Sequence, residues 1–384
     1  MGIFLRFYVI TPLPFNYKFL LHAHSHTALL GWIYLGLTTI IYKIFLEAAK
    51  KAKLYKRIFY FTNICILGML VTFPFQGYAL FSIIFSTLFL FASYWFAWFA
   101  MKYIPTHFKH RFSWKLIKAS LWYLVISSIG PWAIGGVMST LGPTSIWYKT
   151  SIYIYLHFQY NGWFILALLG FIFFILEERG AEFNAKKLKS TFLLLNIGIL
   201  TTVFLSILWF NPPTVFFVLG GIGAIVQILA FNDVYYLIKE WLPSVKEKFG
   251  KLSWLLLRIA ASLLAVKIFM QLSSAHPYFA SLAFRLPNFV IGYLHLVFLG
   301  IVIPAMLSFL LYFKLITLPK SFVWLFLIAL ATTEFLIFYK AMAFWLGLPF
   351  FANFYILLAL LSCLFPIAVG ILFFKQIKSI YLSA

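Results

Sequence analysis

Residues 18–46 read KFLLHAHSHTALLGWIYLGLTTIIYKIFL, a segment that is long and apolar enough to cross a lipid bilayer as one helix. Three histidines, His22, His24 and His26, lie in its first ten residues. Histidine is uncommon inside a bilayer and usually marks a functional site there. The segment therefore predicts both a membrane protein and a candidate site near one membrane surface.

The whole chain has the composition of that segment. Of its 384 residues, 64% are hydrophobic, 22% are aromatic and only 10% are charged. Soluble domains have about 45–50% apolar and about 25% charged residues, and disordered segments are poor in apolar residues, so both classes are excluded. The long unbroken apolar runs also exclude a transmembrane barrel of short alternating strands. The predicted fold is an all-α polytopic membrane protein with a single transmembrane domain over residues 1–384.

Eleven apolar runs are long enough to span a bilayer. They are residues 18–46, 56–76, 79–101, 116–140, 150–176, 190–210, 213–238, 252–274, 287–313, 321–346 and 350–374. Residues 1–11 are apolar as well and are predicted to form part of a further helix, which gives 11–12 transmembrane helices.

The formal net charge of +22 indicates basic loops that lie against anionic lipid rather than a nucleic-acid surface. Most Lys and Arg residues lie in every second connection and in the tail, at residues 43–57, 102–118, 179–189, 239–251, 314–320 and 375–378. By the positive-inside rule these connections and the C-terminus face the cytoplasm. We therefore expect a multi-pass protein of a bacterial inner (cytoplasmic) membrane, with the lipid bilayer as a partner and no nucleic acid.

Three of the predicted helices carry the same local pattern. The runs HTALLGW at 26–32 and HFQYNGW at 157–163 match each other, and HLVFLGI at 295–301 matches both except for Ile301. The histidines are 131 and 138 residues apart, and each step contains four helices, which predicts an internal threefold repeat of four-helix units, about 1–110, 111–245 and 246–384. The shared glycine, as at Gly31 and Gly300, lets another helix or a flat ligand approach the backbone.

The histidines of these three helices are predicted to lie at similar depths in the membrane. Imidazole binds metal ions or haem iron, or relays protons. His22 and His26 share one helix face, whereas His24 points away. A small ion such as copper or zinc could bind this pair together with His157 or His295, whereas a haem would take one histidine from each of two helices.

The runs LHAHSHTALLGW (21–32), YLHFQYNGWF (155–164) and GYLHLVFLG (292–300) resemble those of the heme-copper oxidase subunit I superfamily, which includes cytochrome c oxidases and nitric oxide reductases. Members of that superfamily have twelve helices in three arcs of four. The resemblance implies a low-spin haem b held by His295 and by His26, or by His24 or His22 in its place, with Gly31 and Gly300 beside it. It also implies His26, His157 and His295 as candidate metal ligands.

The chain departs from that family at the ligands of its reaction centre. Tyr293 stands where the family has the histidine of the high-spin haem, and the helix at 190–210 lacks the pair of histidines that binds copper. Only His157 matches a copper ligand. We therefore assign no catalytic residue; if the chain is an enzyme, it is an oxidoreductase of the cytochrome oxidase or nitric oxide reductase type.

These observations predict a divergent subunit I-like membrane protein that binds one bis-histidine haem b for electron transfer or for gas or redox sensing. Other respiratory or redox membrane subunits are the expected protein partners. Two alternatives stay open: a haem-free transporter, channel or assembly scaffold with a histidine-lined, copper or zinc site, and a subunit of a terminal oxidase or nitric oxide reductase.

Overall fold

The computed structural model describes residues 1–383, and the side chains of residues 1–378. Within that range the chain folds into helices and contains no β-strand, which confirms the predicted all-α fold. Eleven helical segments are long and apolar enough to span a membrane: Tyr17–Ala49, Ala52–Gln76 (α4), Leu80–Tyr103 (α5), Phe112–Thr140, Ile146–Glu177, Ala185–Phe210, Thr214–Lys248, Lys251–Ser274 (α13), Pro287–Tyr312, Lys320–Leu346 (α17) and Phe354–Lys378. The chain is a multi-pass membrane protein, as predicted.

Several of these segments consist of consecutive helical elements. They are α2 (Tyr17–His26), η1 (Thr27–Ile33), α3 (Tyr34–Ile41), η2 (Tyr42–Leu46) and η3 (Glu47–Ala49); α6 (Phe112–Ser127) and α7 (Ile129–Thr140); α8 (Ile146–His157), η5 (Phe158–Phe164) and α9 (Ile165–Glu177); α10 (Ala185–Thr202) and η6 (Val203–Phe210); α11 (Thr214–Ile238), η7 (Lys239–Trp241) and α12 (Leu242–Lys248); α15 (Pro287–His295), η8 (Leu296–Val302) and α16 (Ile303–Tyr312); and α18 (Phe354–Ser362) and α19 (Leu364–Ser383). The short helices α1 (Gly2–Phe7), η4 (Thr106–Phe108) and α14 (Pro277–Arg285) lie between or before the spans.

Local sequence signals set the ends of these helices. The Asn16 side chain accepts hydrogen bonds from the backbone N–H groups of Lys18 and Phe19 and so caps α2. A glycine marks the C-terminal end of α17. Gly347 follows the last helical residue, and its φ of 65° lies in the left-handed region that glycine adopts without a steric penalty. Residues near the N-terminus form α1, which is too short to cross a membrane and packs against α2 and α18.

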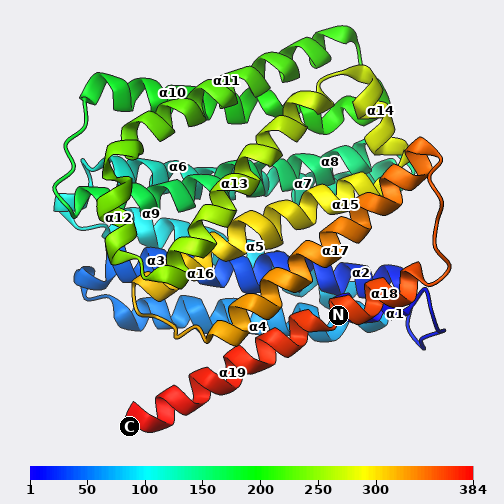
Figure 1. The fold of residues 1–384 in the computed structure, drawn as a ribbon, viewed down its shortest axis with the longest axis horizontal. Helices are drawn as coiled ribbons and strands as arrows, with labels where there is room; N and C mark the ends of the chain where they lie inside the picture. The colour runs from blue at the N-terminus through cyan, green and yellow to red at the C-terminus, as the bar shows by residue number, and fades with distance from the viewer. Residues whose placement is uncertain (384) are drawn as a thin grey trace.

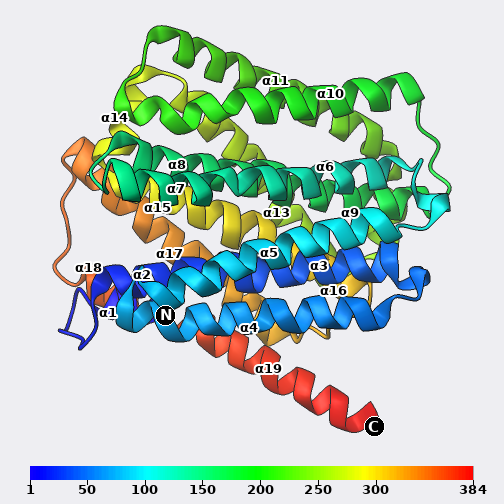
Figure 2. The ribbon, with the colours of Figure 1, turned by 180° about the vertical axis from the view of Figure 1, so that it is seen from behind.

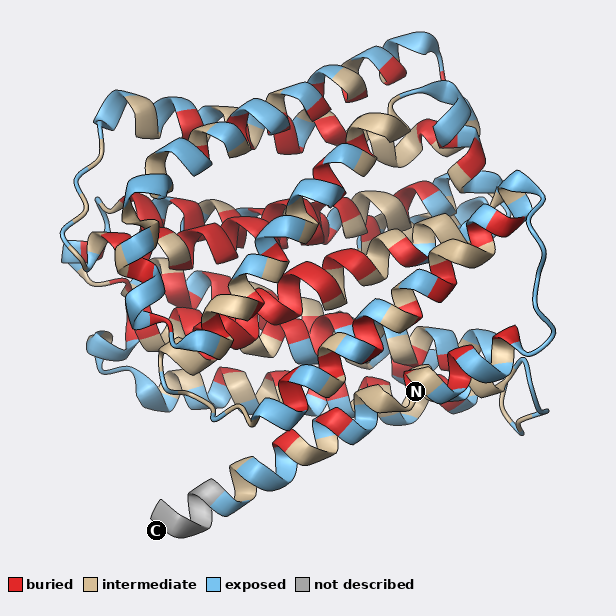
Figure 3. Ribbon diagram, viewed as in Figure 1, coloured by how far each residue is buried: buried red, intermediate tan, exposed pale blue. Residues whose placement is uncertain are grey.

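The three helices that carry the repeated histidine–glycine pattern form the interior of the bundle. Ile146–Glu177 is 94% buried over its most apolar window, Pro287–Tyr312 is 72% buried and Tyr17–Ala49 is 61% buried, whereas the other eight spans are 28–44% buried. Figure 3 shows the buried residues concentrated along the middle of the bundle, with exposed residues on the outer helices. The histidines therefore lie on the helices with the least lipid-facing surface.

The basic connections gather at one end of the bundle. In Figure 1 the turns that follow α3, α9 and α16, the helix α12 and the far end of α19 lie at the left, whereas α14 and the turn between α17 and α18 lie at the right. Figure 2 shows the same separation from behind. The charge alternation along the sequence thus becomes a charge asymmetry between the two ends of the folded molecule.

Each of the three interior helices is interrupted by a π-helical segment at the same place in the pattern. These segments are η1, η5 and η8; each has seven residues and begins directly after His26, His157 or His295. A π-helix adds a residue to the turn and is often found at functional sites. The shared distortion agrees with an internal repeat, while the arrangement of four-helix units in three arcs stays a prediction.

Candidate functional site

His22 and His26 share one face of α2, as their spacing predicts, and this face meets α4 and the residues that follow it. The His26 ring lies 4.5 Å from the Phe73 ring, and the His22 ring lies 4.6 Å from the Tyr78 ring, measured between centroids. His26 Nδ1 is 2.9 Å from the carbonyl oxygen of His22, and its Nε2 is 3.2 Å from the hydroxyl of Tyr78. Both nitrogens of His26 are therefore engaged by the protein itself.

His24 points to the opposite side of α2, also as predicted. A Cβ atom built on Gly2 would lie 3.1 Å from Cε1 of the His24 ring, so α1 packs directly against this imidazole. Arg6, on the same short helix, is close enough to His24 for their charges to interact. No hydrogen bond to a ring nitrogen of His24 is formed by the described residues, in contrast to His26.

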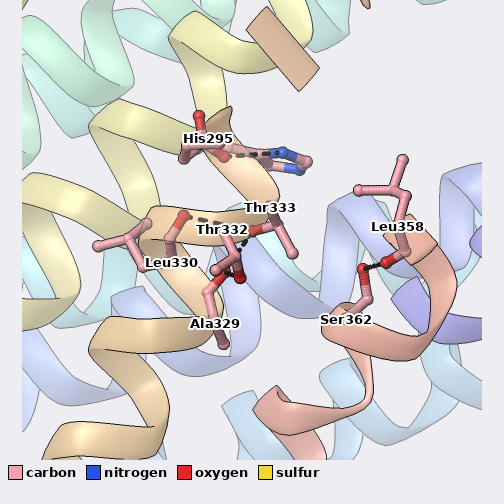
Figure 4. Close-up of polar contacts among 8 residues, drawn as sticks. His295, Ala329, Leu330, Thr332, Thr333, Leu358 and Ser362 are labelled. Atoms are coloured by element: carbon pink, nitrogen blue, oxygen red, sulfur yellow. Dashed lines mark hydrogen bonds and ion pairs between the residues drawn. The ribbon is translucent and has the colours of Figure 1, made fainter. Parts of the chain in front are cut away.

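His295 points toward a buried carboxylate on α17. Its Nδ1 lies 3.5 Å from Oε1 of Glu334, and neither carboxylate oxygen of Glu334 has a hydrogen-bond partner among the described residues. Figure 4 shows that Thr332 and Thr333 donate to carbonyls of their own helix, and that Ser362 does the same in α18, so these hydroxyls already have partners. Among the ion pairs of the described residues, Glu334 is paired with His295 alone.

His24, His295 and Glu334 lie in the same part of the bundle as Arg6. Arg6 and His24 belong to the electrostatic environment of His295, and Glu334 belongs to that of Arg6. The first and ninth spans thus each direct one imidazole to the same region. A Cβ atom on Gly2 would also lie 3.5 Å and 3.7 Å from the two ring nitrogens of His24, so a ligand bound to this imidazole requires the N-terminal end of α1 to move aside.

This donor set fits a haem in its chemistry. Two imidazoles from different helices are the ligands that a bis-histidine haem requires, and Glu334 can accept the remaining N–H of His295. A nearby cavity of about 120 Å³ is lined by Arg6, Tyr17, Asn288, Lys340 and Tyr355 together with apolar side chains. Its two cationic side chains would suit the carboxylates of an amphipathic ligand.

His157 lies in a different environment. It is 1% exposed, and its Nε2 is 2.8 Å from the carbonyl oxygen of Ile199, while its Nδ1 is 3.1 Å from Nδ2 of Asn161. Asn161 in turn binds the ammonium of Lys267, a residue of α13 that is also 1% exposed. Sequence reasoning missed Lys267, although a lysine in the middle of the apolar run at 252–274 is itself a signal, because a charge inside a membrane helix usually has a specific role.

The predicted metal ligands His26, His157 and His295 have separate partners in the structure. The part of the chain that the structure describes contains no group of three or more His, Cys, Asp or Glu side chains arranged to hold a metal ion. A site that combines His22 and His26 with a third histidine is therefore not formed in this arrangement.

The glycines of the repeated pattern are packed against side chains of neighbouring helices. A Cβ atom on Gly31 would lie 3.2 Å from Cγ2 of Ile66, and one on Gly300 would lie 2.7 Å from Cδ1 of Leu263. On Gly162 it would lie 2.4 Å from Cγ of Tyr123. At all three positions the absence of a side chain lets a neighbouring helix pack closely against the backbone. The sequence was also compatible with a flat ligand at Gly31 and Gly300.

Replacing Gly162 by alanine is expected to destabilise the protein by about 1–3 kcal/mol, because the new methyl group overlaps the fixed base of the Tyr123 ring. Gly135 of α7 is the matched control, since a Cβ atom there meets nothing within 4 Å. Denaturation of both variants in detergent, followed by circular dichroism, checks the prediction. Equal stability of Gly162→Ala and Gly135→Ala would contradict it.

Comparisons of the chain with protein-family models and with curated proteins found no match.

Proposed function

We propose that this chain is a membrane haem protein that holds one haem b between His24 and His295. Its role would be one-electron transfer or redox sensing, as expected of a divergent relative of the heme-copper oxidase subunit I superfamily. The observation that carries the proposal is the contact between His295 Nδ1 and Glu334, at 3.5 Å.

That contact matters because of how iron-binding histidines are held in proteins. A ligating histidine usually donates its second N–H to a carboxylate or a carbonyl, which fixes the ring and increases its basicity. With Nδ1 directed to Glu334, the Nε2 atom of His295 is the nitrogen left for iron. The N–H of His295 would also give the buried carboxylate a partner that it otherwise lacks.

His24 is the better second ligand for a haem than His26. Both ring nitrogens of His26 already contact the protein, whereas His24 lies on the side of α2 that interacts with His295. The proposal therefore changes the preferred ligand among the three that the sequence offered. Arg6, which interacts with both rings, would stay near the iron ligands as a positive charge.

A haem held by two histidines supplies reversible one-electron chemistry and leaves no open position for oxygen or nitric oxide. The absence of a histidine at Tyr293 agrees with this role rather than with an oxygen-reducing one. We further propose that the basic end of the bundle and the C-terminus face the cytoplasm of a bacterial inner membrane, and that the electrons come from a redox partner in or at that membrane.

An optical spectrum of the purified protein, expressed with haem supplied, tests the proposal. The reduced protein should show sharp Soret and α bands of a low-spin haem, and carbon monoxide should leave them unchanged because both histidines would already be bound to the iron. A protein that folds and takes up no haem would overturn the proposal. A carbon monoxide-sensitive spectrum would instead favour an oxidase or reductase with an open iron site.

A further inference from the structure

The second buried polar centre of the bundle contains a complete chain of hydrogen bonds. The Lys267 ammonium donates to Oδ1 of Asn161, whose Nδ2 donates to Nδ1 of His157. The Nε2–H of His157 then donates to the carbonyl oxygen of Ile199, at 2.8 Å. This single direction of donation fixes His157 as a neutral ring with its proton on Nε2.

The surroundings of Lys267 are those of a cation site. None of the ion pairs among the described residues includes Lys267, so its positive charge is balanced by dipoles rather than by a carboxylate. Gln271 lies one turn along α13 from Lys267, and Gln227 lines the same cavity as Lys267. Both side chains are buried, and the Oε1 atom of each lacks a hydrogen-bond partner among the described residues. The Tyr160 ring lies 5.9 Å from the Lys267 nitrogen and adds a further favourable electrostatic contact.

A small cavity adjoins the ammonium. It has a volume of about 10 Å³ and is lined by Lys267, Asn161 and Gln227 together with apolar side chains. That volume is about what a single water molecule needs, and the unpaired oxygen of Gln227 could accept a hydrogen bond from such a water. There is no further room for an ion with its own ligands.

We infer that the Lys267 ammonium is a tethered cation that fills the site beside His157 and closes it to copper and zinc. A metal ion would need the Nδ1 lone pair of His157, but this lone pair accepts a hydrogen bond from Asn161. The Nε2 atom of His157 carries a proton that it donates to the carbonyl oxygen of Ile199. A metal ion at His157 would also meet the positive charge of Lys267 at short range. The donor set at this site thus disagrees with the copper ligand that the family resemblance implies for His157.

This inference is independent of haem binding and concerns other metals, so the two can fail separately. The test is to incubate the purified full-length protein with excess Cu(I) under reducing conditions, or with Zn(II), and to measure the bound metal after desalting. The wild-type protein and His157→Ala should retain the same amount of metal, because His157 contributes no ligand. One equivalent of copper or zinc that is lost in His157→Ala would overturn the inference.

Exchange of the tethered cation for a ligand gives the complementary test. Lys267→His/Asn161→Ala, which removes the cation and frees Nδ1 of His157, should gain about one equivalent of copper or zinc, and the triple variant that adds His157→Ala should lose it again. Lys267→Leu/Asn161→Ala, which removes the charge without adding a ligand, is the matched control and should gain none. A monodisperse Lys267→His/Asn161→Ala protein that gains no metal would show that Lys267 and Asn161 are not what keep the site closed, and would also overturn the inference.

Discussion

Replacing His295 by alanine is expected to abolish the Soret and α bands that the proposed haem would give, because the iron would lose the ligand that Glu334 orients. His24→Ala should have the same effect, since it removes the imidazole proposed as the second ligand of the haem. His26→Ala should keep the bands, because both nitrogens of His26 are bound to the protein rather than directed to that region. Absorbance spectra of the three variants at equal protein concentration measure these effects.

This series separates the histidines that the sequence could not separate. His24 and His26 lie two residues apart on one helix, so the His26 variant controls for the general effect of an alanine at this depth. Loss of the bands in His26→Ala together with their retention in His24→Ala would contradict the ligand assignment. Retention in His295→Ala would contradict the proposed site as a whole.

Glu334→Gln provides a subtler variant within the same series. It keeps a hydrogen-bond acceptor near His295 and removes the negative charge, so haem should still bind. The midpoint potential of the haem should rise, because a nearby carboxylate stabilises the oxidised iron more than the reduced iron. A redox titration of the bound haem measures this shift, and an unchanged potential would mean that Glu334 does not act on the iron ligand.

Replacing Asn161 by leucine is expected to lower the free energy of unfolding by about 3–5 kcal/mol, the usual cost of leaving a buried charge without its partner. The variant deprives the Lys267 ammonium of its acceptor and His157 of its donor, both in a region that is almost inaccessible to water. Titration with SDS in mixed micelles, followed by circular dichroism, gives the free energy.

Gln159→Leu is the matched control for this prediction. Gln159 lies two residues from Asn161 in η5, is equally buried, and donates to the hydroxyl of Ser127, which has a second partner in its own helix. Loss of this neutral contact should cost only about 1 kcal/mol. The double variant Asn161→Leu/Lys267→Leu should be more stable than the two single effects predict, because no buried charge is left unpaired. Simple additivity would argue against a charged Lys267.

The membrane fold could be predicted from the sequence in nearly all its parts. The length of an apolar run and the position of basic residues are local properties, and they decide where a helix crosses a bilayer and where it turns. The observed spans therefore begin and end close to the predicted ones; the main difference is Thr214–Lys248, where η7 and α12 continue the helical path through a basic segment predicted as a connection. The face shared by His22 and His26 also follows from helix periodicity alone.

Which groups those faces meet was decided only by the tertiary structure. Spacing puts His24 opposite His26 on the helix. It does not predict that His26 contacts the hydroxyl of Tyr78, or that His24 lies in the same electrostatic environment as Arg6 and His295. Nor does it pair Glu334 with His295 or Lys267 with Asn161, because each pair joins different helices, which are consecutive spans for the first pair and 106 residues apart for the second. The sequence by itself determined the helices and their order, since these depend on local hydrophobicity; the two polar centres depend on how those helices rotate and pack, and only the folded bundle fixes that.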